Sequence, residues 1–489
     1  MTQVLTSAPS ALTPSAGAMT RYAPVIVLVY LALQCLSRIL IPSSLGVDEA
    51  EQMITAQSLD WGYGRQPPLY TWIQIGVFQI VGEGKVGLVL LKHALMAAIY
   101  LGVWVLARWL GAGPIAAGMA ILGTALLPTV IWNAQRELTH LVLVTAMSVW
   151  TMIAVLAALE RSKLWLFVLI GVMFGAGLLS KWNYTFFQAG LLGVILIDRR
   201  ARTPLWLVSV AVMLAVIGLP GWWAYQNWDL TTAAVQSFEM ERQVTALGAL
   251  DAFWDLIECV LAEIAILAIV FFLCLLAGQK AAMEPPWQLK MIERIVVIGL
   301  VIVALGAALS GVTEIRHRWL LPLLIFVPLI LAVRFEAKLT PQVFRWFTRV
   351  VLVVMLAVLI LFPRHLLRGH SNPARQSTPF AAAADAIELK DGLALAPNFF
   401  IGGNVRLVRP DIAVITPQVA ALRVEGPPDL VIWGSRDRAE TPAPSSLAAL
   451  TEMKLGYPVD LSSPETVAVP YPTPHQDRFY HMFWVEMPE

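Results

Sequence analysis

Long apolar runs alternate with short polar linkers over most of this chain. A helix needs about 20 apolar residues to cross about 30 Å of hydrocarbon. The pattern predicts about eleven spans, of which the sixth is short, near residues 22–42, 86–107, 114–132, 141–159, 164–180, 184–197, 204–224, 256–276, 293–311, 319–333 and 347–363. The predicted fold class is therefore a polytopic α-helical membrane protein with about eleven transmembrane helices.

The pattern changes after residue 363, where the long apolar runs stop. Short β-like segments such as "IAVIT" and "DLVIWG" follow, together with a helical "FAAAADAIELK". These segments predict a small soluble α/β domain at residues 364–489. The glycine pair in its "FIGGNVRLV" indicates a turn rather than a phosphate cradle.

The N-terminal segment lacks a charged region ahead of an apolar core, so it does not resemble a cleaved signal peptide. We therefore predict a flexible cytoplasmic tail at residues 1–21 and a transmembrane domain at 22–363. The first outer loop of that domain covers residues 43–85.

Composition agrees with a membrane protein. Hydrophobic residues make up 58% of the chain and charged residues 14%, against roughly 45–50% and 25% in soluble domains. The net charge of +1 gives no reason to expect nucleic acid. Cys35, Cys259 and Cys274 all lie in apolar runs and form neither a disulfide framework nor a zinc spacing. No motif indicates a cofactor with certainty, and a divalent metal is left open.

The charges of the linkers predict the orientation of the chain. One set of linkers is short and basic, with residues such as Arg108, Arg199 and Arg334. Basic linkers face the cytoplasm by the positive-inside rule. An odd number of spans then places the N-terminus inside and residues 364–489 outside.

The outer linkers carry charges of both signs close to the ends of the spans, which predicts one shared site on the outer face. The stretch "GVDEAEQMITAQSLDWGYGRQPPLYTW" (residues 46–72) holds the adjacent acids Asp48 and Glu49. They are candidates for a general base, because an apolar wall and nearby cations shift the pKa of a carboxylate. The alternative is a helix on the surface, where Asp48 and Glu49 would simply stabilise the first turn through the helix dipole.

The same stretch contains a Pro67–Pro68 step, which restricts the backbone. It would hold Arg65, Gln66 and Tyr70 rigidly beside the acids, or it simply forms a stiff loop. The next outer linker, "NAQRELTH", places Arg136 and His140 on one face if it is helical. Its Glu137 would then form an ion pair with a basic neighbour.

Two further linkers suggest an anion site. Lys181 closes the apolar run of "GLLSKWNY" on the outer side, where either snorkelling or an anionic ligand explains it. In "GVTEIRHRWLLP", Arg316, His317 and Arg318 are adjacent and would repel one another unless an anion lay among them. This is the strongest phosphate-binding signal in the chain.

The order of these motifs resembles the type C glycosyltransferases related to protein O-mannosyltransferases. The closest resemblance is to the bacterial branch of lipid A aminoarabinose transferases and lipopolysaccharide galacturonosyltransferases, over about residues 22–335. It implies an inverting transfer of one sugar from a polyprenyl-phosphate donor to a lipid A, lipopolysaccharide or other envelope glycan acceptor. The reaction would take place on the outer face of the bacterial inner membrane, among membrane lipids, with residues 364–489 in the periplasm.

The resemblance also implies roles for single residues. Asp48 matches the position of the catalytic acid, with Glu49 beside it. The aminoarabinose enzymes usually have Lys before the proline step, where this chain has Gln66. Donor and phosphate binding would fall to a set of outer-linker residues: Arg65, Gln66, Tyr70, Arg136, His140, Lys181, Arg316, His317 and Arg318.

Two other functional classes remain open on the sequence. A lipid or glycan transporter or flippase would place polar groups near the midplane of the bilayer, whereas here they gather at one face. A non-enzymatic lipid-binding subunit would keep the cations and would not need Asp48.

Overall fold

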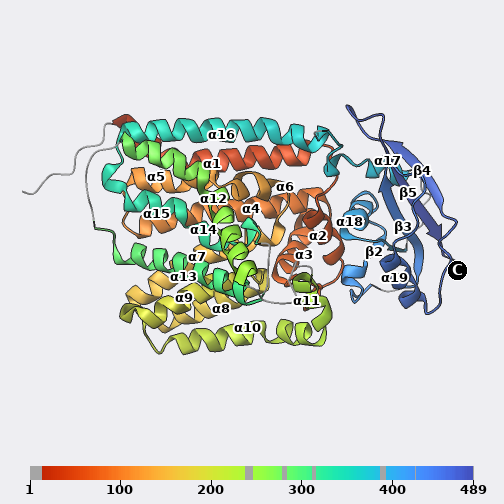
Figure 1. The fold of residues 1–489 in the computed structure, drawn as a ribbon, viewed down its shortest axis with the longest axis horizontal. Helices are drawn as coiled ribbons and strands as arrows, with labels where there is room; N and C mark the ends of the chain where they lie inside the picture. The colour runs from red at the N-terminus through yellow and green to blue at the C-terminus, as the bar shows by residue number, and fades with distance from the viewer. Residues whose placement is uncertain are drawn as a thin grey trace, which may run out of the picture.

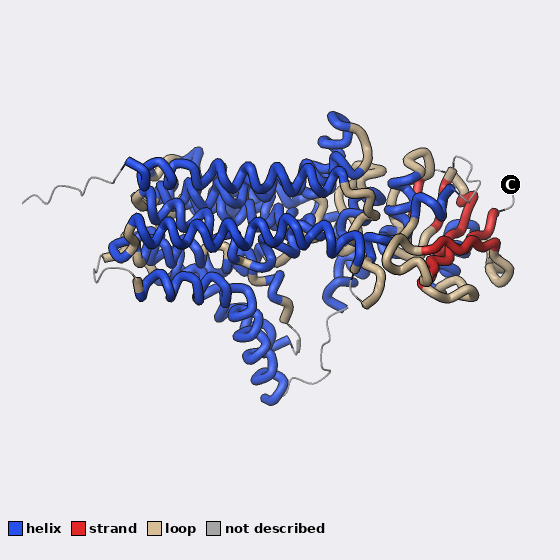
Figure 2. The backbone as a smooth tube through the Cα atoms, turned by 90° about the horizontal axis from the view of Figure 1, so that it is seen from above, coloured by secondary structure: helices blue, strands red, loops and turns tan. Residues whose placement is uncertain are grey.

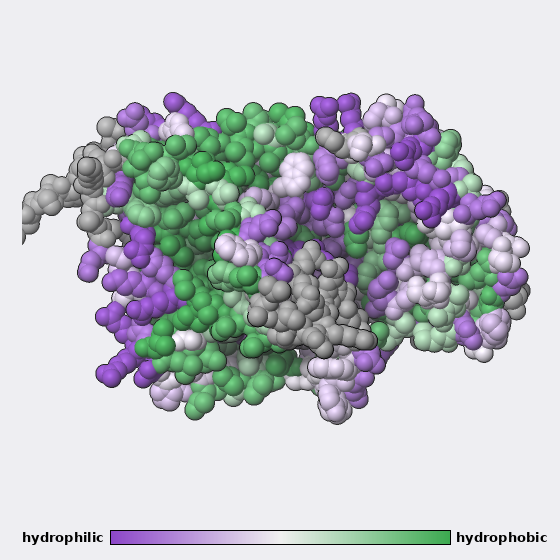
Figure 3. Space-filling model, viewed as in Figure 1, coloured by the Kyte–Doolittle hydropathy of each residue, from purple (hydrophilic) through white to green (hydrophobic). Residues whose placement is uncertain are grey.

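A bundle of long helices makes up most of the molecule, and a small sheet lies at one end of it (Figures 1 and 2). The structure is a computed structural model, and it describes residues 14–236, 246–277, 284–310, 315–369, 371–385, 392–424 and 426–487. The surface of the bundle is largely hydrophobic, with hydrophilic residues at the far end and around the sheet (Figure 3).

Seven described helices are long and apolar enough to cross a membrane. They are α1 (Pro14–Leu40), α4 (Lys85–Trp109), α7 (Thr139–Arg161), α10 (Trp206–Gln226), α12 (Ala246–Leu276), α13 (Trp287–Ser310) and α16 (Pro341–Arg368). A bent pair at residues 114–136 makes an eighth span if it is counted as one. The predicted polytopic membrane fold is confirmed.

The other three predicted spans are shorter helices. They are α8 (Leu164–Ser180), α9 (Tyr184–Ile197) and the pair α14 (Leu321–Leu324) and α15 (Val327–Arg334). At 1.5 Å per residue, the 14 residues of α9 rise only about 21 Å. The count of eleven therefore depends on including helices that are shorter than the hydrocarbon layer.

The bent pair breaks where α5 (Pro114–Gly123) gives way to η1 (Thr124–Leu126), the π-helix η2 (Thr129–Asn133) and α6 (Ala134–Arg136). The two parts meet at 65°. Glu263 of α12 stabilises the break, because its carboxylate accepts hydrogen bonds from the Thr129 amide at 3.2 Å and hydroxyl at 2.6 Å. The buried Glu263 carboxylate thus accepts a hydrogen bond from the Thr129 N–H, which lacks an ordinary helical partner at the break.

The expectation that Arg136 and His140 share one helix face is wrong. Arg136 ends α6, and Leu138 then adopts a left-handed conformation with φ of 69° before α7 begins at Thr139. A left-handed residue stops the helical repeat. The two side chains therefore belong to different helices.

The C-terminal residues form a five-stranded mixed sheet in the order β2-β1-β3-β5-β4. Its strands are β1 (Leu393–Leu395), β2 (Ala413–Ile415), β3 (Pro428–Arg436), β4 (Glu465–Pro470) and β5 (Phe479–Glu486). β1 pairs in parallel with β2 and β3, and β5 pairs antiparallel with β3 and β4. The helices of this region are α17 (Phe380–Asp385), α18 (Phe399–Val408) and α19 (Ser445–Leu455), so the predicted α/β character is confirmed.

Three helices complete the bundle and its edge: α2 (Val47–Thr55) and α3 (Leu69–Val81) in the first outer loop, and α11 (Trp228–Gln236) after α10. Short 3₁₀ turns are η3 (Arg199–Ala201), η4 (His317–Trp319), η5 (Glu336–Lys338), η6 (Arg375–Ser377) and η7 (Pro417–Val419). The proline step is therefore followed directly by a helix, α3, and not by a longer loop.

Helix α18 packs directly on α2, which carries the candidate acids. The predicted glycine turn is wrong, since Gly402 and Gly403 lie inside α18. A Cβ atom at Gly403 would lie 2.2 Å from the carbonyl oxygen of Ala50, so glycine allows the two helices to approach this closely. The Asn404 amide oxygen also accepts a hydrogen bond from the Leu45 N–H at 2.7 Å.

A second contact joins the sheet to the same loop. The side chain of Gln57 accepts from the N–H of Val414 and donates to its carbonyl oxygen, both at 2.8 Å. Ile54 and Tyr63 of the loop share a hydrophobic cluster with strands and helices of the sheet region. The first outer loop is thus enclosed between the helix bundle and the C-terminal sheet.

Candidate active site

Helix α2 presents acids on two different faces. Asp48 and Glu51 are three residues apart and lie on one side of the helix, whereas Glu49 points to another side. The helix begins after Gly46, whose N–H donates to the Glu49 carboxylate at 3.1 Å. The two faces have different surroundings and different uses.

Glu49 is the centre of a buried ion triad. Its carboxylate lies 2.6 Å from Arg38 of α1 and 2.7 Å from Lys92 of α4, and the exposed fraction of all three side chains is at most 1%. Burial by itself would raise the pKa of Glu49, but the two cations outweigh burial and lower it to about 2. Since both carboxylate oxygens are engaged, Glu49 anchors α2 to the bundle and holds cations beside the site.

Asp48 is half-buried, and its carboxylate accepts a hydrogen bond from the Leu138 N–H at 3.0 Å. Its negative charge acts on two cations from distant parts of the chain, Lys181 and Arg318. Burial lowers the pKa of each of these cations, and Asp48 opposes that effect. The fold therefore brings together a carboxylate and two partly desolvated cations, as the sequence predicts for the shared site.

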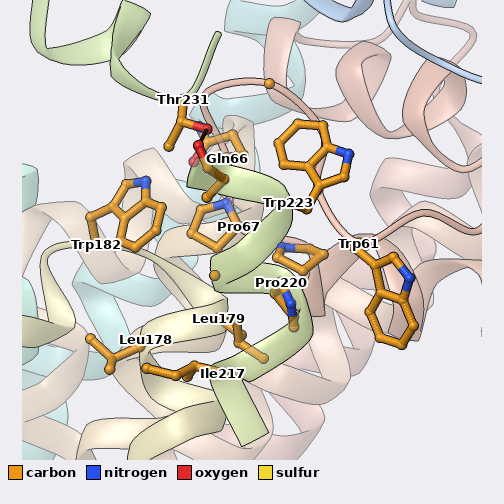
Figure 4. Close-up of a pocket in the computed structure, with 15 residues that line it drawn as sticks. Trp61, Gln66, Pro67, Leu178, Leu179, Trp182, Ile217, Pro220, Trp223 and Thr231 are labelled. Atoms are coloured by element: carbon orange, nitrogen blue, oxygen red, sulfur yellow. Dashed lines mark hydrogen bonds between the residues drawn. The ribbon is translucent and has the colours of Figure 1, made fainter. Parts of the chain in front are cut away.

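The proline step contributes Arg65 and Gln66. The Arg65 Nε atom lies 4.0 Å from a Glu51 oxygen, and the Arg65 carbonyl oxygen accepts from the indole N–H of Trp182 at 3.4 Å. Gln66 and the following prolines line an adjoining pocket of about 470 Å³. Most of that pocket wall is apolar, with the rings of Trp61, Trp182 and Trp223 around it (Figure 4).

Tyr70 and His140 lie inside the bundle. Both are almost fully buried, and their rings are 5.2 Å apart. The His140 ring nitrogens lie 3.2 Å from the Ser180 carbonyl oxygen and 3.2 Å from the Gln52 amide nitrogen. These contacts place both residues in the packing that supports α2.

The remaining predicted residues lie at the edge of the site. Arg136 and Glu137 form an ion pair at 3.1 Å, which agrees with the ion pair predicted for Glu137 and a basic neighbour. Burial raises the pKa of Glu137, and Asp48 adds to the rise. Arg316 and His317 are exposed, unlike the half-buried Arg318, and a ring nitrogen of His317 lies 3.4 Å from the Asn133 amide nitrogen.

Glu51 is a residue that the sequence analysis missed. Its exposed fraction is 1%, and burial raises its pKa to about 7, with Arg65 opposing and Asp48 adding to the rise. The signal in the sequence was its position one helical turn after Asp48 in "DEAEQ". Within the described ranges, no group of three or more His, Cys, Asp or Glu side chains is arranged to hold a metal ion.

Comparison with known proteins supports a transferase. Residues 65–223 match the family model described as dolichyl-phosphate-mannose-protein mannosyltransferase. The chain is 28% identical to the lipopolysaccharide core galacturonosyltransferase RgtB of Rhizobium johnstonii, over 94% of this chain and 96% of RgtB. It is also 28% identical to RgtA of the same organism, over 85% of this chain and 87% of RgtA.

Solved structures show the same fold. ArnT from Cupriavidus metallidurans bound to undecaprenyl phosphate superposes with a TM-score of 0.56 at 13% identity, covering 95% of this chain and 98% of ArnT. Sequence similarity and fold together indicate a multi-pass membrane glycosyltransferase with the fold of ArnT. The resemblance predicted from the motif order is confirmed, and so is the prediction of a glycosyltransferase over a transporter.

We expect the Glu49 triad to dominate the stability of this glycosyltransferase. Glu49→Gln leaves two buried cations without their counter-charge, which costs about 3–5 kcal/mol in comparable buried pairs. Because the folded pKa of about 2 lies below the ordinary 4.5, the contribution is fully present above pH 4.5 and is lost as pH falls through about 2. Thermal unfolding in detergent should therefore show the same large decrease in the stability of Glu49→Gln, relative to the wild type, from about pH 8 to about pH 6.

The matched control is Glu293→Gln, which removes a partly exposed pair with Arg334. Such pairs contribute about 0–1 kcal/mol. Equal unfolding temperatures for the two variants would contradict the anchoring role of Glu49.

Proposed function

We propose that this enzyme transfers galacturonic acid from a polyprenyl-phosphate carrier to the lipopolysaccharide core or lipid A. The observation that carries the proposal is the half-buried Asp48 carboxylate, held by the Leu138 N–H, whose charge acts on two partly buried cations, Lys181 and Arg318. The similarity over nearly full length to galacturonosyltransferases of the lipopolysaccharide core supports the choice of sugar and acceptor. The likeness to an ArnT structure that holds undecaprenyl phosphate supports the carrier.

The chemistry needs a base and a group of cations. Asp48 takes the proton of an acceptor hydroxyl while the oxygen of that hydroxyl forms a bond to the anomeric carbon of the sugar. The bond from that carbon to the phosphate oxygen breaks, and its electron pair stays on the phosphate. Preorganised cations stabilise the charge that grows on the leaving group, and Lys181 and Arg318 are in position to supply them.

An acidic sugar fits the charge of the site. Arg65, Lys181 and Arg318 form a cluster in which the charge of each affects its neighbours, against the acids Asp48 and Glu51. A lipid phosphate together with a uronate carboxylate would add negative charge to this cluster. Arg65, at the proline step, is the third cation of this cluster and would interact with the uronate.

The apolar pocket beside Gln66 supports a lipid substrate. It is formed by the proline step, the end of α8 and the end of α10, where Pro220 and Trp223 lie (Figure 4). An isoprenoid chain would gain free energy by leaving water for such a wall. The pocket adjoins the polar site, as the carrier of a phosphate-linked sugar requires.

We also propose that the site and the C-terminal α/β domain, residues 364–489, face the periplasm. The basic linkers meet at the opposite end of the bundle, where Arg294 pairs with Asp198 and Arg334 with Glu293. That end would face the cytoplasm by the positive-inside rule. A reporter fused after Glu489 should be periplasmic and one fused after Arg202 cytoplasmic; a cytoplasmic reporter after Glu489 would overturn the orientation.

Asp48→Asn should abolish most of the transfer while leaving the fold intact. Asparagine keeps the size and the hydrogen bond from Leu138 but cannot take the proton, and loss of a general base costs about 10²- to 10⁴-fold in rate. The measurement is transfer from labelled undecaprenyl phosphate galacturonic acid to lipopolysaccharide core in membranes, normalised to folded protein. Asp198→Asn, at the other end of the bundle, is the matched control, and wild-type transfer by Asp48→Asn would reject the catalytic role.

Arg318→Ala should weaken binding of undecaprenyl phosphate more than Arg316→Ala. Arg318 is half-buried and interacts with the charge of Asp48, and a charge-assisted hydrogen bond contributes more where solvent is excluded. We expect a loss of roughly 10-fold or more for Arg318→Ala. Binding of the carrier to purified protein checks this, with Arg294→Ala as the control; equal losses for Arg316 and Arg318 would contradict the ranking.

A further inference from the structure

Glu51 stands apart from the other buried acids of the described residues. Glu49 is paired with two cations, Glu263 accepts two hydrogen bonds from Thr129, and Asp60 accepts one from the N–H of Trp61. Neither oxygen of the Glu51 carboxylate has a hydrogen-bond partner, although the exposed fraction of the residue is 1%. The carboxylate therefore has acceptor capacity that no described residue uses.

The nearest cation does not satisfy Glu51. The Arg65 Nε atom lies 4.0 Å away, which is beyond hydrogen-bond distance, and it has no hydrogen-bond partner of its own. A buried carboxylate without hydrogen-bond partners carries an uncompensated desolvation free energy. A ligand that donates a hydrogen bond to the carboxylate offsets this free energy. Glu51 and the Arg65 Nε atom are thus two complementary groups side by side, and neither has a hydrogen-bond partner among the described residues.

The position of Glu51 indicates which substrate supplies the hydrogen-bonding group. Asp48, one helical turn earlier, is half-buried and open to an acceptor that arrives from outside. Glu51 is deeper, among the charges of Arg65, Asp48 and Lys181. In the proposed reaction the sugar of the donor lies between the base and the phosphate-binding cations, so its hydroxyl groups come closest to Glu51.

We propose that Glu51 accepts a hydrogen bond from a hydroxyl group of the transferred sugar and thereby selects the sugar of the donor. The inference rests on the proposed function and adds a specificity-determining residue to it. Sites that hydrogen-bond a substrate hydroxyl reject analogues that lack it far more strongly than apolar pockets reject a missing methylene. The neighbouring Arg65 would donate a hydrogen bond to another oxygen of the same sugar.

The experiment compares two probes that differ only in the sugar. Undecaprenyl phosphate and undecaprenyl phosphate galacturonic acid are bound to the purified full chain as wild type, Glu51→Ala, Glu51→Gln and the control Glu293→Gln. We expect Glu51→Ala to bind the bare carrier as the wild type does and the sugar-loaded carrier roughly 10- to 100-fold more weakly. Glu51→Gln, which keeps an acceptor oxygen, should lose less.

A structural role would give a different result. If Glu51 only held Arg65 or α2 in place, both probes would bind more weakly to Glu51→Ala, and the proposal would be overturned. It would also be overturned if neither probe changed. Kinetics give a further readout, since the KM for the donor should rise while the KM for the acceptor stays the same.

Donors that lack single hydroxyl groups complete the test. The wild type should discriminate against one of these deoxy donors, and Glu51→Ala should accept that donor and the complete one equally. Retention of the wild-type preference by Glu51→Ala would refute the role of Glu51 while leaving the proposed function intact. Absence of transfer from any polyprenyl-phosphate sugar by the wild type would instead refute the proposed function itself.

Discussion

The buried pairing of Glu49 with Arg38 and Lys92 is the constraint on which the site depends. It joins α2 to the first and second long helices of the bundle at a point that is shielded from solvent. Lys92 also donates to the carbonyl oxygen of Gln135, which ties the broken helix to the same point. A charge of this kind is costly to bury and far more costly to leave unpaired, so the triad fixes where α2 begins and how it is rotated.

The rotation of α2 then divides its acids between two tasks. With Glu49 held by the bundle, Asp48 and Glu51 face Lys181, Arg318 and Arg65. The C-terminal sheet holds the same helix from the other side through the close approach of Gly403 to Ala50 and the bonds of Gln57 to Val414. The sheet region therefore contributes to the geometry of the site by fixing the position of α2.

The surroundings of the site match a reaction at a membrane boundary. The charged groups lie at the end of an apolar bundle, and a pocket walled by tryptophan and proline adjoins them (Figures 3 and 4). Partial burial strengthens the interaction of the cations with a bound anion, because the local dielectric is lower than that of water. A soluble nucleotide donor would not need this apolar wall, whereas a lipid-linked sugar does.

The sequence alone determined the membrane class, the long spans, the α/β character of the C-terminal residues and the Asp48 candidate, because hydrophobic runs and ordered local motifs report these directly. It assigned the base to Asp48 but could not show which groups hold the two acids, since Lys92 is 43 residues from Glu49 and the Leu138 amide is 90 residues from Asp48. It also placed Arg136 and His140 on one face, since nothing in "NAQRELTH" signals the left-handed Leu138. Which acid is paired, which is half-exposed and which is buried without a partner was decided by tertiary packing, because burial and charge pairing depend on neighbours that are distant along the chain.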